Sequence, residues 1–172
     1  SGLRGGHSGI DIHLVRGNAI KLLAEALRDL SAHSDGRLIE LKGGTARNAI
    51  PREAYATCAL PAAIASTIDE WVRHRHEAWQ QRYAAEDAEV SFVCKHFDTP
   101  PDTAIARDGQ ERVLAFLDTA TSGVERISED FPGVTDTSSN LGVLALEQGA
   151  FKATFKVRSL HDGRADALAG KM

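Results

Sequence analysis

The spacing of apolar residues changes along this chain, and that change restricts the fold more than any other feature of the sequence. From Val15 to His33 apolar side chains recur at the period of an amphipathic helix. The segments 37–41 and 54–60 read instead as two strands joined by a turn rich in glycine and proline. A second helix is predicted to start at or just after Pro61, and residues 90–97 read as another short strand. The first half therefore alternates helices and strands.

This order predicts an α+β fold. With a strand at or just before Gly2, the first half reads β-α-β-β-α-β, which is the order of a ferredoxin-like sandwich. The second half predicts a turn followed by a weak helix start over 98–109, with the helix continuing over 112–121. A loop-rich stretch, a hairpin over 140–160 and the start of a final helix follow. We expect a ferredoxin-like lobe over residues 1–97 and a second, partial lobe over 98–172, both cut from a longer protein.

Charge and cysteine content exclude several classes of protein. The 20 Lys and Arg are interspersed with 24 Asp and Glu for a net charge of -4, so no basic surface for nucleic acid is expected. No apolar run approaches the roughly 20 residues that span a bilayer, so no membrane partner is expected either. Cys58 and Cys94 lie in strand-like runs, which favours two buried free thiols and a reducing compartment. The sequence therefore predicts a cytoplasmic protein.

The opening segment "GLRGGHSGIDIH" places His7 among glycines. Glycines allow positive φ and close backbone approach, which suits a loop that presents a side chain to a ligand. The spacing matches neither dinucleotide-binding nor P-loop patterns. An exposed histidine in a strand-to-helix turn remains the alternative. The other histidines form no pattern typical of a zinc site, so no metal ligand is predicted in this chain.

Three more polar residues stand next to predicted strands. Asn48 precedes "AIP" and either caps that turn or points its amide at a ligand, and Asn140 repeats this pattern weakly before a later strand. Arg158 ends the last predicted strand, where its guanidinium could bind a carboxylate through two hydrogen bonds. A surface ion pair is the alternative for Arg158.

The segments "GLRGGHSGIDIHLVRGNAIKLLAEAL", "GGTARNAIPREAYAT", "SSNLGV" and "FKVRSLHD" resemble the lid domain of aminoacyl-histidine dipeptidases. These enzymes, also called Xaa-His dipeptidases or peptidase D, are cytosolic metallopeptidases of the M20 family. The resemblance covers nearly the whole chain. It implies a catalytic domain that is absent from this chain and holds two divalent ions, usually zinc, together with the glutamate base. It also implies that the lid alone is inactive and binds no metal.

The resemblance assigns roles to the residues already singled out. His7 is similar to the lid histidine that stabilises the oxyanion of the attacked amide. Asn48 matches the asparagine that helps to hold the substrate, Arg158 sits where a lid arginine binds the substrate's C-terminal carboxylate, and Asn140 lies beside it as a further substrate-binding residue. The implied partners are a dipeptide, the protein's own catalytic domain and a second subunit. Because the second lobe resembles a built-in partner subunit, homodimerisation stays open.

A different class of function is compatible with the same pattern. A ferredoxin-like sandwich also serves as a non-catalytic dimerisation or small-ligand regulatory module. The two hypotheses differ in one structural consequence. A lid requires His7, Asn48 and Arg158 to lie together on one face, whereas a regulatory module does not.

Overall fold

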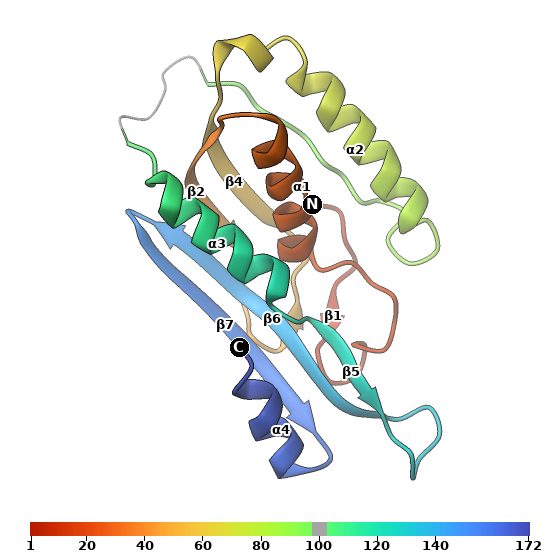
Figure 1. The fold of residues 1–172 in the computed structure, drawn as a ribbon. Coiled ribbons are helices and arrows are strands. Elements are labelled where there is room, and N and C mark those ends of the chain that lie inside the picture. The colour runs from red at the N-terminus through yellow and green to blue at the C-terminus, as the bar shows by residue number, and fades with distance from the viewer. Residues whose placement is uncertain (98–102) are drawn as a thin grey trace.

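The computed structural model describes residues 1–97 and 103–172 of the chain (Figure 1). Its main sheet has five strands in the order β4-β2-β6-β5, with β7 also paired to β6, and all pairs are antiparallel. A separate two-stranded sheet joins β1 to β3. The elements in chain order are β1 (Gly6–His7), α1 (Ala19–His33), β2 (Arg37–Gly43), β3 (Ala49–Ile50), β4 (Ala54–Ala59), the 3₁₀ helix η1 (Ala62–Ile64), α2 (Ile68–Arg82), α3 (Arg107–Thr119), β5 (Gly123–Ile127), β6 (Thr135–Glu147), β7 (Ala150–Ser159) and α4 (Asp162–Ala169).

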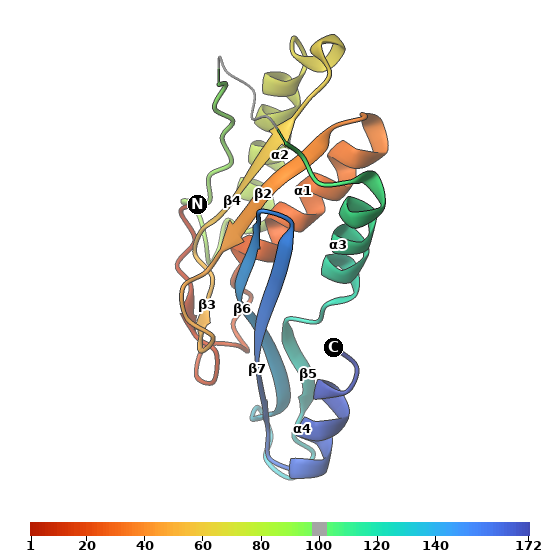
Figure 2. The ribbon, with the colours of Figure 1, turned by 90° about the vertical axis from the view of Figure 1, so that its left-hand side faces the viewer.

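The main sheet combines strands from both halves of the chain. β2 pairs with β6 from Leu41 opposite Leu146 to Gly43 opposite Leu144. The two lobes that were predicted to meet between residues 97 and 98 therefore contribute strands to one continuous sheet. Helices α1 and α3 cover one face of this sheet, while β1 and β3 lie over the other face (Figure 2). This arrangement leaves the N-terminal loop beside β6 and β7.

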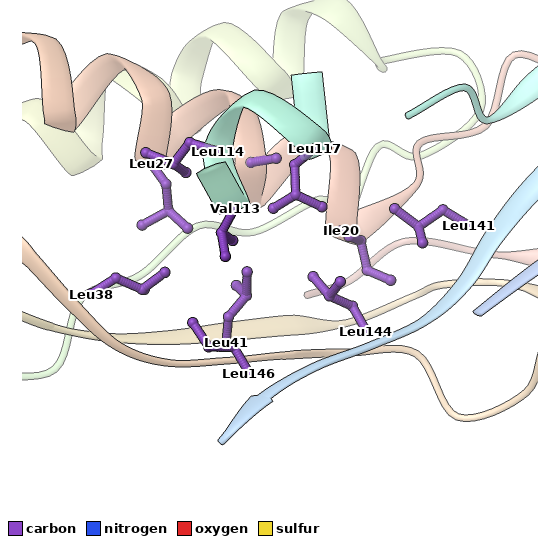
Figure 3. Packing of buried hydrophobic residues seen from close by; sticks show 11 residues of the cluster. Ile20, Leu27, Leu38, Leu41, Val113, Leu114, Leu117, Leu141, Leu144 and Leu146 are labelled. Carbon is purple, nitrogen blue, oxygen red and sulfur yellow. The ribbon is translucent and has the colours of Figure 1, made fainter. Parts of the chain in front are cut away.

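The larger core lies between the sheet and helices α1 and α3 (Figure 3). Leu117 of α3 and Leu141 of β6 are fully buried, at 0% exposure. Truncating such a leucine to alanine typically costs about 2–5 kcal/mol. The buried residues of this core are Ile20, Ala24, Leu27, Leu38, Leu41, Val113, Leu114, Leu117, Leu141, Leu144 and Leu146. Because they come from both halves of the chain, one core holds the two halves together.

A second core joins α2 to the other side of α1. Trp79 packs there with Leu22, and Val90 and Phe92 join them from the segment after α2. Residues 90–97 were predicted to be a strand, and this prediction is wrong, because Val90 and Phe92 pack with Trp79 of α2 and the segment joins no sheet. The place beside β2 is taken by β6 instead. The α+β class is confirmed, but the sheet is completed from the second half of the chain.

Several element boundaries also differ from those predicted. α1 begins at Ala19 because the side chain of Asn18 caps it, with Oδ1 accepting from the Ile20 N–H at 3.0 Å. The Asn18 amide also donates to the Leu141 carbonyl at 3.0 Å, which ties the helix start to β6. The stretch expected to be loop-rich contains β5 and the start of β6. α3 begins at Arg107, within the segment 98–109 that was predicted to contain a helix start. The final segment forms α4, a complete short helix.

The predicted β-hairpin is confirmed. The predicted hairpin is formed by β6 and β7, and its turn places Gln148 and Gly149 at φ 51° and 78°. Part of the predicted 98–109 turn, residues 98–102, lies outside the described residues. Both cysteines are free, but the prediction that both are buried is wrong. Cys58 in β4 is only half-buried, and Cys94 is exposed because its segment is not part of the sheet. No helix within the described ranges is both long enough and apolar enough to cross a membrane.

Candidate functional site

The glycine-rich loop that carries His7 is closed by a single buried carboxylate. Asp87, 1% exposed, accepts the Arg4 N–H at 2.7 Å and the Gly17 N–H at 2.6 Å. Arg4 and Gly17 are the two ends of the loop, so Asp87 holds both ends at one point. Hydrogen bonds from N–H groups to a carboxylate are among the stronger ones in proteins.

A second carboxylate fixes the loop from inside. Asp11 Oδ2 accepts the His7 N–H at 2.8 Å and lies 3.6 Å from the guanidinium of Arg16. Arg16 also donates to the Gly5 carbonyl at 2.6 Å. The backbone of His7 is therefore held by this network, and its side chain is half-buried.

The imidazole of His7 is held in one tautomer by its own loop. The Gly9 N–H donates to His7 Nδ1 at 3.2 Å, so Nδ1 acts as an acceptor and bears no proton. In the neutral ring the proton then resides on Nε2, which is a hydrogen-bond donor. His7 thus offers an N–H group at the surface of the loop.

Arg158 lies directly against the same loop. A Cβ atom built on Gly9 would stand 2.8 Å from Arg158 Nε, so only glycine allows this approach without displacing the arginine. Among the described residues, Arg158 forms no ion pair, and its buried Nε has no hydrogen-bond acceptor. The alternative of a surface ion pair is therefore not what the structure contains. The guanidinium is held next to the His7 loop with its charge uncompensated by a carboxylate in this part of the chain.

Asn48 joins the site through strand pairing. β1 pairs with β3, with His7 opposite Ala49, and the Ser8 N–H donates to the Asn48 carbonyl at 2.8 Å. The side chain of Asn48 is exposed. The segments that carry His7, Asn48 and Arg158 therefore lie next to one another on the β1–β3 side of the sheet.

Asn140 lies beneath this surface rather than on it. Its side chain is fully buried, and its amide donates to the carbonyls of Arg47 and Ala49 at 3.0 and 2.8 Å. The neighbouring Gly142 permits the same close approach, because a Cβ there would be 2.7 Å from Arg47. Asn140 thus fixes the turn that carries Asn48, and its role in binding substrate stays a prediction.

Sequence reasoning missed the groups that hold the loop in place. Asp87 is separated from Arg4 and Gly17 by most of the first half of the chain, and nothing local marks it as a loop anchor. Asn18 carried a local signal, since an asparagine directly before a helix is a strong capping residue. Asp11 also had a local signal of its role, because it stands four residues after His7 within the same short loop and can accept a hydrogen bond from it.

The site is an open surface made mainly of hydrogen-bond donors. The larger of the two described cavities, about 310 Å³, is lined by residues of α1, α2 and α3 and not by His7 or Arg158. A neutral imidazole N–H and a guanidinium suit a ligand that carries negative charge, such as a carboxylate or a developing oxyanion. The surface can therefore bind and polarise an anionic or carbonyl group that approaches from outside the chain.

Comparison with known proteins gives consistent matches. Residues 1–87 match the family model described as the peptidase dimerisation domain. The chain is 34% identical over 171 residues to the cytosol non-specific dipeptidase of Escherichia coli (strain K12), covering 99% of this chain and 35% of that protein. The crystal structure of aminoacylhistidine dipeptidase from Vibrio alginolyticus superposes with a TM-score of 0.91 at 36% identity, over 99% of this chain and 34% of that one. The chain thus spans about a third of the length of each relative.

Proposed function

The chain belongs to the M20 peptidase dimerisation domain family, and from this premise we propose that it is the substrate-clamping lid of a cytosolic, metal-dependent dipeptidase. The relatives are a cytosol non-specific dipeptidase and an aminoacylhistidine dipeptidase, which supports peptide hydrolysis as the reaction of the parent protein. The lid contributes side chains that contact the substrate when it closes on the catalytic domain. Closure of a lid excludes water and completes the site.

His7 is proposed to stabilise the oxyanion that forms when water attacks the peptide carbonyl. The hydrogen bond from the Gly9 N–H to Nδ1 leaves the proton of a neutral imidazole on Nε2, so Nε2 is the ring atom available as a donor. An N–H donor that is fixed before the reaction stabilises developing charge without the cost of reorienting. Asp11 and Asp87 act as positioning residues, since they hold the backbone of the loop and do not reach the substrate themselves.

Arg158 is proposed to bind the C-terminal carboxylate of the dipeptide, with Asn48 holding the substrate beside it. A dipeptidase must recognise a free carboxylate close to the scissile bond, and a guanidinium does this through two parallel hydrogen bonds. Contact with Gly9 fixes the distance between this arginine and the His7 loop. The two groups would then bind the same small molecule at neighbouring positions.

The residues of this surface do not fit a dinuclear metal centre. His7 is the one imidazole of the surface described above, and the cluster of three potential metal ligands found in the described ranges lies instead at the start of α2. No step of the reaction is therefore assigned to a metal held by this chain. The metal of the parent enzyme, zinc by resemblance, belongs to the catalytic domain in this proposal, and the lid alone is expected to be inactive.

The contact between Gly9 and Arg158 is the observation that carries the proposal. It joins the loop of His7 to the strand of Arg158, although the two residues stand at opposite ends of the chain. A regulatory module of the same fold needs no such convergence. The family description supports a homodimeric parent. Histidine at the second position of the dipeptide is implied only by the name of the Vibrio alginolyticus relative, whereas the Escherichia coli relative is a non-specific dipeptidase.

Steady-state kinetics of the parent enzyme on β-alanyl-histidine and other dipeptides test the proposal. His7→Ala is expected to lower kcat by about a hundred- to a thousandfold, the usual effect of removing an oxyanion donor. Arg158→Ala is expected mainly to raise KM, by about tenfold or more. The matched controls are His13→Ala in the same loop and Lys152→Ala on the same strand, both exposed residues. Wild-type kinetics in both site variants would favour the dimerisation module instead.

A further inference from the structure

Three side chains with metal-binding atoms meet on the surface beside helix α2. Asp69 belongs to the first turn of α2, and Cys94 and His96 belong to the extended segment that follows the helix. One ligand atom of each residue lies within 4.8 Å of the other two. Asp69 Oδ1 and His96 Nε2 are 2.9 Å apart. None of the residues assigned to the His7 site belongs to this cluster.

Packing of the extended segment on α2 explains why these residues meet. After α2 the chain turns and runs back beside the helix (Figure 1). Phe92 packs against Trp71 and Trp79, with ring centroids 5.7 and 4.9 Å apart, and its N–H donates to His76 Nδ1 at 3.2 Å. Residues two apart in an extended chain point to the same side, so Cys94 and His96 both face the start of the helix.

We propose that Asp69, Cys94 and His96 form a surface binding site for a divalent ion of the zinc type. Thiolate, imidazole and carboxylate are the three side-chain ligands that zinc uses in proteins. With bonds of about 2.0–2.3 Å, tetrahedral ligand atoms stand about 3.3–3.8 Å apart. The present cluster needs only small side-chain movements to reach that spacing, and water completes the fourth position.

The cluster is open to solvent. Asp69, Cys94 and His96 are all exposed, so a cation can reach their ligand atoms without any rearrangement of the fold. A thiolate ligand forms as the ion binds, because metal binding displaces the thiol proton. A bound ion would also link the extended segment directly to α2, in addition to the aromatic contacts of Phe92. The site is independent of the proposed peptidase function, because it involves none of the residues assigned to substrate.

Titration of the 172-residue chain with Co²⁺ in the presence of a phosphine reductant tests this site without any substrate. Wild type is expected to bind one equivalent and to show thiolate-to-cobalt charge-transfer absorption that Zn²⁺ displaces. Cys94→Ser is expected to abolish that absorption. His96→Ala is expected to weaken binding by more than about a hundredfold, since even the loss of an outer partner of a ligand costs up to about that much.

Two control variants separate this site from nonspecific binding. Cys58→Ser is expected to keep the absorption, because burial raises the pKa of Cys58 to about 12 and disfavours its thiolate. His74→Ala is expected to keep the affinity, since this exposed histidine of α2 lies near Glu70 instead. Zn²⁺ should raise the melting temperature of wild type but not of Cys94→Ser. Absence of the charge-transfer absorption in wild type, or its persistence in Cys94→Ser, would overturn the proposal.

Discussion

Asp87→Asn tests whether one buried carboxylate determines the shape of the His7 loop. Asp87 accepts two backbone N–H groups, from Arg4 and Gly17, at 2.7 and 2.6 Å. A hydrogen bond to a charged group contributes about 1.5–3 kcal/mol. Asparagine keeps one acceptor oxygen and turns an NH₂ group toward the other backbone N–H. We therefore expect Asp87→Asn to lose about 1.5–3 kcal/mol of the free energy of unfolding and Asp87→Ala to lose about 3–6 kcal/mol.

Urea unfolding of the chain measures these losses, and hydrogen exchange locates them. The amides of Arg4 and Gly17 should lose protection in both variants, while amides of the β6–β7 hairpin should change only with global stability. In the parent enzyme, Asp87→Asn should lower kcat more than it raises KM, because the displaced group is the loop of His7 and not Arg158.

Glu86→Gln is the matched control for this prediction. Glu86 is the adjacent residue, is partly exposed, and lies 3.7 and 3.9 Å from Arg4 and Arg16 in loose ion pairs. Such pairs contribute about 0–1 kcal/mol. If Asp87→Asn destabilises the chain no more than Glu86→Gln does, or if Arg4 and Gly17 keep their protection, then Asp87 does not anchor the loop.

Three further predictions concern other parts of the fold. Gly142→Ala places a Cβ 2.7 Å from Arg47, so it should cost about 1–3 kcal/mol in urea unfolding, whereas Gly163→Ala, with open space around it, should not destabilise. Hydrogen bonds from Thr137 and Ser159 and the charge of Arg164 hold the pKa of Asp136 below its usual value. Its contribution to stability is therefore present above the unfolded-state pKa of about 3.9 and is lost as pH falls through the lower folded-state pKa, so Asp136→Asn should flatten the acid side of the stability curve. Cys94 is exposed and should react with a disulfide reagent in the folded chain at pH 8. Cys58 is half-buried and its pKa is raised to about 12 by desolvation, so it should react much more slowly until the chain unfolds; equal rates in the folded chain would contradict this difference.

Local patterns in the sequence were sufficient to predict those elements whose partners lie close in the chain. The helical period of the apolar residues predicted α1. Alternating apolar and polar residues on both sides of a glycine-containing turn predicted the β6–β7 hairpin. Residues 90–97 have the composition of a strand, yet Phe92 packs against Trp71 and Trp79 instead. A strand-like pattern does not specify which apolar surface the segment will cover, and here Phe92 of the segment covers the tryptophans of α2.

Local sequence patterns were also insufficient to predict how the candidate site is assembled. The surroundings of His7 and Arg158 drew attention to both residues, but their meeting depends on the approach of Gly9 to the guanidinium, which joins opposite ends of the chain. The anchoring by Asp87 and the meeting of Asp69 with Cys94 and His96 are likewise contacts between distant segments. Contacts of this kind follow from the packing of whole elements, so spacing within one segment cannot reveal them.

A double-mutant cycle between enzyme and substrate tests the central claim most directly. The parent enzyme would be assayed as wild type and as Arg158→Ala, each with a dipeptide and with the same dipeptide carrying a C-terminal amide in place of its carboxylate. If Arg158 binds that carboxylate, amidation should lower kcat/KM of the wild type by about tenfold to a hundredfold and should have little further effect on Arg158→Ala. An equal penalty for amidation in both enzymes would show that Arg158 does not recognise the carboxylate, and the substrate-clamping role would fail.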